Sequence, residues 1–176
     1  LIPDSETTLY ELTAGDVLVE IGTVPYRFST SMDFAPDGTG YLAVGGPQGA
    51  VYGQPEFWGG MIYSFDPATG TLAEYHEEPH GHAIEIDVDP TTGFVWWAMH
   101  RTLWYKNAGG QVIPVDYPNP TGEAQPRYLT FAPDGTLNAF LDLPSDGNIQ
   151  WHHRLYTRSA GGVWTERLAG DGPALG

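Results

Sequence analysis

The chain has 176 residues, with 22 acidic but only seven basic side chains, and a formal net charge of −15. Such a charge repels the phosphates of nucleic acid and anionic lipid headgroups, so we expect neither as a partner. No apolar run approaches the roughly 20 residues that span a bilayer, which excludes membrane insertion, and without cysteine neither disulfides nor thiolate metal sites can form.

One phrase recurs along the chain: an apolar run that ends in a turn sequence. It reads MDFAPDG at 32–38, IDVDPTTG at 86–93 and LTFAPDG at 129–135. Apolar and polar residues alternate in each run, as is typical of half-buried strands. Repeats of this period are too small to bury their own apolar faces and stack on their neighbours. We therefore predict an all-β chain, a β-propeller of four-stranded antiparallel blades.

In chain order, residues 7–22 are predicted as a half blade, followed by full blades at 31–76, 83–117 and 127–168. The half blade consists of strands at 8–12 and 17–21. The strands of the full blades are expected at 31–35, 40–45, 61–66 and 71–76; at 83–89, 94–100, 102–107 and 111–117; and at 127–132, 136–143, 154–158 and 162–168. Six dipeptides fall between these runs, where tight hairpins need positive φ: Asp37-Gly38, Thr69-Gly70, Thr92-Gly93, Gly109-Gly110, Asp134-Gly135 and Gly161-Gly162.

Residues 1–176 therefore read as one partial propeller domain of about three and a half blades. The half blade has the third and fourth strands of a blade, but not the first and second. It could complete the last blade, although that blade already has four strands. Alternatively, two copies make a seven-bladed ring, or the chain is half of a longer propeller. Open edges and half-covered faces invite pairing, so another copy or further blades are expected partners.

The long connections between strands all emerge at one end of the predicted blades. They cover residues 23–30, 46–60, 77–82, 118–126 and 144–153. Ligand sites concentrate on loops that a rigid scaffold holds, so this end is the expected ligand face. Aromatic side chains in these loops, beside arginine and histidine, are typical of sugar or peptide contacts, but they could equally pack onto the blades. The candidate ligand-binding residues are Tyr26, Arg27, Tyr52, Trp58, His100, Arg127, Trp151 and His152.

Acidic residues of the innermost strands suggest a second kind of site. Asp33 and Asp87 occupy matching positions in successive blades, and carboxylates that line a central channel suit Ca²⁺ or Mg²⁺. The alternative is that such residues hydrogen-bond the turn that follows them, which we expect of Asp89 before Pro90. Three aromatic residues of the second full blade, Trp96, Trp97 and Trp104, lie within predicted strands and are expected to pack between blades.

Several of these phrases resemble a known group of propellers. The run IYSFDPATGTLAEY at 62–75, with PHG at 79–81, DVDP at 87–90 and VWW at 95–97, resembles the repeat of streptogramin B lyase and NHL-like propellers. The PDGT phrases resemble the same broad group, which includes gluconolactonase-type propellers. The resemblance implies a Mg²⁺-dependent lyase that uses His and Glu on its ligand face. Here only His80, His82 and Glu85 could carry that role.

Two functions follow. The first is a secreted binding module, extracellular or periplasmic, that recognises a glycan, a peptide, a protein or a small molecule through its long-loop face. The second is a metal-assisted lyase or hydrolase of the streptogramin B lyase-like type, in which a cation polarises the substrate and a histidine moves the proton. Propellers host both classes of function.

Overall fold

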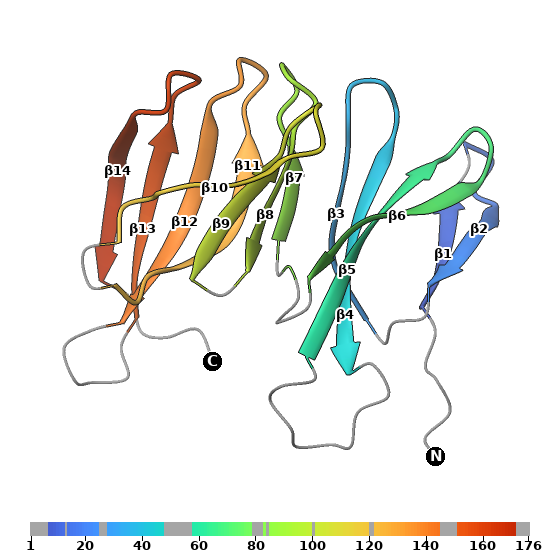
Figure 1. Ribbon diagram of the computed structural model, residues 1–176, viewed down its shortest axis with the longest axis horizontal. Helices are drawn as coiled ribbons and strands as arrows, with labels where there is room; N and C mark the ends of the chain where they lie inside the picture. Colours follow the sequence, from blue (N-terminus) through green and yellow to red (C-terminus); the bar gives the residue numbers. More distant parts are fainter. Residues whose placement is uncertain are drawn as a thin grey trace. The chain divides into compact units, whose positions relative to one another are not determined.

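The computed structural model describes residues 7–12, 14–24, 28–47, 58–78, 83, 85–99, 101–119, 122–144 and 151–171. These residues form 14 β-strands and no α-helix (Figure 1). The part of the chain described here accordingly contains no helix that could cross a membrane.

The strands form one two-stranded sheet and three four-stranded sheets. The small sheet pairs β1 (Thr7–Leu12) with β2 (Leu18–Val24). The other sheets comprise β3 (Phe28–Phe34), β4 (Gly40–Pro47), β5 (Trp58–Asp66) and β6 (Thr71–Glu78); β7 (Glu85–Val88), β8 (Val95–Met99), β9 (Thr102–Lys106) and β10 (Val112–Pro114); and β11 (Gln125–Phe131), β12 (Leu137–Pro144), β13 (Trp151–Arg158) and β14 (Trp164–Asp171). The predicted four-stranded blades and the half blade are thus confirmed.

The turn predictions are confirmed as well. The second residue of all six predicted turn dipeptides is a glycine with φ between 65° and 89°. In two equivalent turns the aspartate also accepts a hydrogen bond from the backbone two residues later, at 2.9 Å in both Asp37 and Asp134. Glycine and Asx turns are therefore what separates the strands of this repeat.

Extra residues in the sheets show which strands are equivalent. In β2, β6 and β14 the register shifts by one residue, so that Ile21, Tyr75 and Arg167 form β-bulges. Each bulge lies opposite a Leu-Tyr or Ile-Tyr pair, as at Leu9-Tyr10 in β1. Because β1 and β2 share this bulge with the last two strands of full blades, they are the third and fourth strands of a blade, as predicted.

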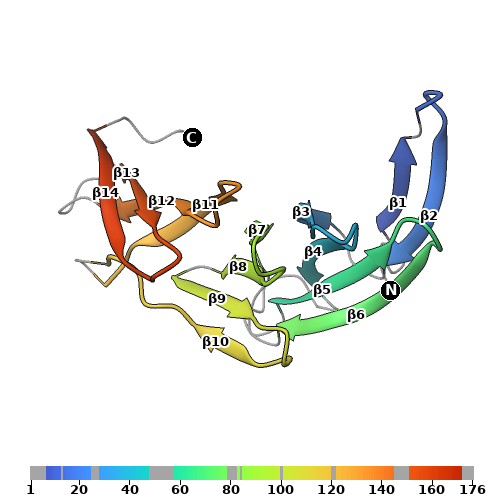
Figure 2. The same ribbon diagram turned by 90° about the horizontal axis from the view of Figure 1, so that it is seen from above.

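The chain divides into two compact units, Leu1–Ile86 and Asp87–Gly176. In the first unit, β2 contacts β6, and the half blade packs on the sheet β3 to β6 (Figure 2). Val24 of the half blade joins a core with Leu42, Val44, Met61 and Tyr63, and Leu9 and Leu72 pack against it. The half blade is therefore anchored by one of its two faces.

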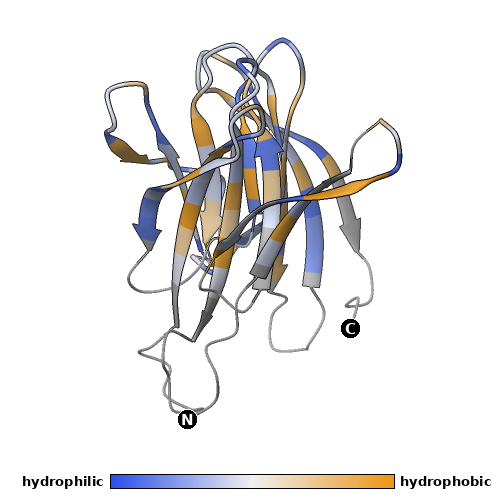
Figure 3. Cartoon of the chain, turned by 90° about the vertical axis from the view of Figure 1, so that its right-hand side faces the viewer, coloured by the Kyte–Doolittle hydropathy of each residue, from blue (hydrophilic) through white to orange (hydrophobic). Residues whose placement is uncertain are grey.

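In the second unit, the blades β7 to β10 and β11 to β14 contact each other through β8, β9 and β11. Trp96 stands edge-on to Phe131 at 5.5 Å, and the Arg158 guanidinium lies over its ring. Trp97 is fully buried. The packing between blades predicted for Trp96 is thus confirmed, whereas for Trp97 the structure shows burial and the contact between blades stays a prediction. Apolar and polar bands alternate along the strands of both units (Figure 3), the pattern from which the strands were predicted.

Candidate functional site

The last blade carries a charged cluster at one end of its sheet. The hairpin turns of this blade lie at 132–136 and 159–163, and we call the opposite end, where β11 and β13 begin and β12 ends, the loop end. Near this end the Asp142 carboxylate contacts an arginine and a histidine side chain. Its Oδ2 accepts a hydrogen bond from Arg127 Nε at 2.9 Å, and its Oδ1 lies 2.7 Å from His153 Nδ1.

A β-bulge positions Arg127. Pro126 pairs with Leu141 and Tyr128 with Phe140, so Arg127 is an extra residue with no partner in the register. A bulge bends the strand and re-aims the side chain. Asp142 is mostly buried and Arg127 is exposed. Among the described residues, the guanidinium makes no bond other than that to Asp142.

His153 is held directly opposite Asp142 in the β12–β13 register. If Nδ1 carries the proton it donates to the carboxylate, and Nε2 is then the acceptor nitrogen. Nε2 is buried and has no hydrogen-bond partner among the described residues. The carboxylate therefore fixes both the arginine and the imidazole, which preorganises the three side chains.

The equivalent end of the first full blade lacks these side chains. Aligning the MDFAPDG and LTFAPDG phrases places Thr30, again a bulged residue, at the position of Arg127. The register pair Gly45 and Gly60 stands where Asp142 and His153 stand. The same backbone thus carries an arginine, an aspartate and a histidine in one blade, and a threonine and two glycines in the other.

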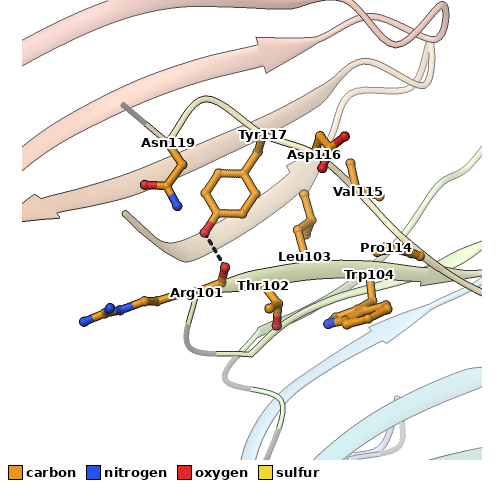
Figure 4. A pocket seen from close by; sticks show the side chains of 9 residues that line it. All are labelled: Arg101, Thr102, Leu103, Trp104, Pro114, Val115, Asp116, Tyr117 and Asn119. Carbon is orange, nitrogen blue, oxygen red and sulfur yellow. Dashed lines mark hydrogen bonds between the residues drawn. The ribbon is translucent and has the colours of Figure 1, made fainter. Parts of the chain in front are cut away.

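A pocket of about 260 Å³ lies in the same unit, between the start of β9 and the connection from β10 to β11. Leu103 points toward Tyr117 across it, whereas the Arg101 guanidinium points away (Figure 4). The Tyr117 hydroxyl lies 2.6 Å from the Arg101 carbonyl oxygen and 2.7 Å from that of Ala124, and burial raises its pKa to about 12.

The pocket wall is fixed by bonds within the chain. Asn119 Oδ1 accepts a hydrogen bond from the Ala124 amide at 2.8 Å, and Trp164 Nε1 donates to the Asp116 carbonyl oxygen. Trp104, expected to pack between blades, lines this pocket. Tyr117 and Asn119 already bond the backbone, so these two side chains serve to hold the pocket wall.

Two acidic residues of β7 form bonds across strands. Asp87 accepts a hydrogen bond from the Phe131 amide of β11 at 2.7 Å and another from the Val88 amide. Ser31 Oγ donates to Glu85 Oε1 at 2.8 Å, both within the first unit. Burial raises the pKa of Glu85, and the Ser31 hydrogen bond partly opposes this.

Asp89 confirms the alternative expected for it. Its carboxylate accepts hydrogen bonds from the Thr91 amide and from the hydroxyls of Thr91 and Thr92, at 2.7 to 2.8 Å. The described residues include no group of three His, Asp or Glu side chains that could hold a metal. A Ca²⁺ or Mg²⁺ site at Asp33 and Asp87 therefore stays a prediction.

The remaining predicted site residues are divided by what the structure describes. Those outside the described residues are Tyr26, Arg27, Tyr52, His80, His82 and His100. The prediction that Trp58 and Trp151 lie in loops is wrong: they are the first residues of β5 and β13, paired with Pro47 and Pro144. Pairing extends these hairpins beyond the apolar runs, because tertiary context overrides weak local strand propensity.

His152 and His153 show the effect of strand parity. Successive residues of a strand point to opposite faces, so only His153 shares a face with Asp142, whereas His152 pairs with Leu143. Sequence reasoning selected His152 and missed Asp142 and His153 as a pair. The signal that could have found them is Asp142 itself, a carboxylate inside the apolar run LDL of a predicted strand.

No protein-family model matches the chain, and no curated protein matches it. Solved structures do. The extracellular domain of what is described as a one-component system from B. thetaiotaomicron aligns with 94% of this chain and 21% of its own length, at 15% identity and a TM-score of 0.54. A Lactobacillus plantarum protein aligns with 94% of this chain and 51% of its own, at 12% identity and a TM-score of 0.53.

Virginiamycin B lyase from Staphylococcus aureus aligns with 78% of this chain and 54% of its own length, at 13% identity and a TM-score of 0.46. The chain thus spans between 21% and 54% of the length of these three proteins. At such identities the likeness shows the fold alone. The fold is part of a β-propeller of four-stranded blades, and it resembles the group of propellers named from the sequence.

Proposed function

We propose that the protein is a binding module whose loop end at β11 to β13 recognises a ligand rich in hydrogen-bond acceptors, such as a glycan or peptide that carries a carboxylate. The observation that carries this proposal is the Arg127, Asp142 and His153 cluster. Asp142 bonds the guanidinium Nε at 2.9 Å, and the Arg127 side chain is 42% exposed. Arginine held in this way pairs with carboxylates in a defined geometry.

The comparison between blades supports a functional rather than a structural role. The first full blade keeps the same strands, turn and bulge with Thr30, Gly45 and Gly60 at these positions. The scaffold therefore does not require charged side chains there. Moreover, an exposed arginine in a chain of net charge −15 attracts anionic groups that most of the surface repels.

An extracellular or periplasmic location belongs to the same proposal. It is supported by the likeness to an extracellular domain at a TM-score of 0.54. A chain with 22 acidic residues and no cysteine is compatible with export. Detection of the protein outside the cytoplasm of its native host, by fractionation and immunoblotting, tests the location.

Binding is tested with a panel of acidic and neutral oligosaccharides and of peptides with free or amidated carboxyl ends. We expect a carboxylate-bearing probe to bind, and Arg127→Gln to weaken it about 10-fold or more, the usual range for a central charged contact. Arg154→Gln is the matched control, because Arg154 pairs with Glu166 at 2.7 Å in the same blade. Equal binding of the amidated and free peptides, or equal loss in both variants, would contradict the proposal.

A second candidate function, a metal-assisted lyase or hydrolase, is favoured by Glu85. Burial raises its pKa, so it keeps its proton at a higher pH than an ordinary glutamate and suits a general acid. In this reading Glu85 would act with His80 and His82. Loss of turnover in Glu85→Gln with unchanged ligand affinity would support it, and full turnover in that variant would exclude it.

The proposed cation is tested separately. An ion bound only by the folded protein raises the melting temperature by mass action. If Asp33 and Asp87 hold Ca²⁺ or Mg²⁺, adding the ion should raise the melting temperature of the wild type and have less effect on Asp87→Asn. An equal response of both proteins would rule out these ligands.

A further inference from the structure

The last blade exposes large apolar side chains on one face of its sheet. Leu129, Ala139 and Leu141 are buried, on the face that packs on the neighbouring blade of the unit. The residues that alternate with them along each strand lie on the opposite face. There Tyr128 is 66% exposed and Phe140 is 40% exposed, and their rings meet edge to face.

This open face extends across all four strands. Phe140 pairs with Leu155 of β13, and Leu155 pairs with Leu168 of β14, which is 60% exposed. Large apolar side chains on adjacent strands thus form a continuous patch, the tail face, defined by Tyr128, Phe140, Leu155 and Leu168. Among the described residues, no element covers it. Contiguous exposed patches of this kind mark interaction surfaces.

The half blade exposes a second such face. The side of the half blade that carries Leu9 and Val24 packs on β3 to β6. On the other side Tyr10 is 54% exposed and Leu18 is 64% exposed, and Glu20 lies directly opposite Tyr10 in the register. We call Tyr10, Leu18 and Glu20 the head face. β1 also has a free edge within the described sheet, because β2 is its one neighbour there.

The two faces differ in their surrounding charge. Residues 1–86 contain 13 acidic residues and one arginine, whereas residues 87–176 contain nine acidic and six basic residues. The head face carries Glu20, and the tail face is flanked by Arg127 at its loop end and by Arg167, whose Nε donates to Thr157. Glu20 of the head face and Arg167 beside the tail face thus carry opposite charges, which favours contact of a head with a tail over contact of like faces.

We propose that the head face of one copy of this chain docks on the tail face of a second copy. The first unit already shows the type of packing involved, because the other side of the half blade packs on a blade there. Docking would bury Tyr10 and Leu18 of one copy against Phe140 and Leu168 of the other. Such an interface is heterologous, since each copy uses two different surfaces.

This inference goes beyond the proposed ligand function, and its test changes residues outside the Arg127, Asp142 and His153 cluster. Ligand recognition is assigned to the charged loop end, whereas docking uses the apolar middle of the sheet. A variant that fails to dock but still binds a carboxylate probe would leave the ligand proposal intact. A variant that docks but does not bind would leave this one intact.

The test uses one variant for each face and measures mass by analytical ultracentrifugation. Phe140→Glu places a negative charge on the tail face, and Leu18→Lys places a positive charge on the head face. Wild type is expected to self-associate. For each variant alone, the dissociation constant of self-association is expected to rise about 10-fold or more, so that the variant is monomeric at concentrations where wild type associates. An equimolar mixture is expected to regain a two-copy species, because Phe140→Glu keeps an unchanged head face and Leu18→Lys keeps an unchanged tail face.

Val163→Glu is the matched control, since Val163 is 66% exposed in the β13–β14 turn, outside both faces. It should associate as wild type does, and high salt should weaken association in both. Circular dichroism checks folding, and Leu168→Glu and Tyr10→Lys replace any variant that unfolds. A monomeric wild type at high concentration, or Leu18→Lys that still self-associates, would overturn the proposal.

Discussion

The blade β3 to β6 and the blade β11 to β14 share one backbone plan but differ at the loop end. Both have a positive-φ glycine after an aspartate in the first turn, at Gly38 and Gly135. Both place a bulge in their first strand. However, the earlier blade has Thr30, Gly45 and Gly60 at the positions of Arg127, Asp142 and His153. What the repeat needs for folding is therefore separable from what one blade adds to it.

The difference teaches where function can be sought in a repeat protein. Positions that are alike in both blades, such as the turn glycines, are explained by backbone geometry. Positions where one blade holds a bonded charge cluster and the other holds glycine are not explained by the fold. These positions are the ones we assign to ligand recognition.

The largest effect on stability is expected when a core residue of one blade is placed at the equivalent position of the other. Gly40 aligns with Leu137, which is buried in the last blade. A Cβ at Gly40 would overlap the Phe65 ring, and Phe65 is itself buried and cannot move freely. Gly40→Leu is therefore expected to cost about 3 kcal/mol, as overpacking does, measured by urea unfolding.

An unchanged unfolding midpoint in Gly40→Leu would mean that the Phe65 ring can leave the space over Gly40. The two blades would then be interchangeable at this core position. Leu137→Gly is the reciprocal substitution, and it should destabilise by leaving a cavity and a flexible strand residue.

A smaller effect is expected at Glu85, the partner of Ser31. Tyr128 takes the place of Ser31 in the last blade. Because burial raises the folded pKa of Glu85 above the ordinary 4.5, its contribution to stability is full below pH 4.5 and is lost as pH rises through the folded pKa. Gln would keep the acceptor for Ser31 without the charge. We expect Glu85→Gln to raise the melting temperature relative to wild type at pH 7 but not at pH 4.

The smallest effect concerns the turn aspartates, where the blades are alike. Hydrogen bonds from Thr39 and Thr136 lower the pKa values of Asp37 and Asp134. Their contribution to stability is present above the ordinary pKa of 3.8 and is lost as pH falls through the lowered pKa. We expect Asp37→Asn and Asp134→Asn to lower the melting temperature slightly and equally at pH 7. Unequal losses would show that the turns are not equivalent.

The sequence predicted the strands and turns because their signals are local. Alternation in MDFAPDG and a glycine at each turn depend on neighbouring residues only. The charged cluster depends on register, since Asp142 and His153 are 11 residues apart and meet only when β12 and β13 pair. Arg127 was selected from sequence, but the bulge that aims it at Asp142 was not foreseen, because a bulge is defined by the pairing of β11 with β12 and not by either strand alone.

The central claim is that the loop-end cluster serves recognition and not folding. The most direct test is Arg127→Thr, which installs the residue of the equivalent bulge at Thr30, measured for both urea stability and affinity for the carboxylate probe that wild type binds. We expect a change in unfolding free energy within about 1 kcal/mol, because Arg127 is on the exposed side of the ion pair and Asp142 keeps its contact with His153, together with at least about 10-fold weaker binding. Unchanged affinity, or unfolding of the variant, would contradict the claim.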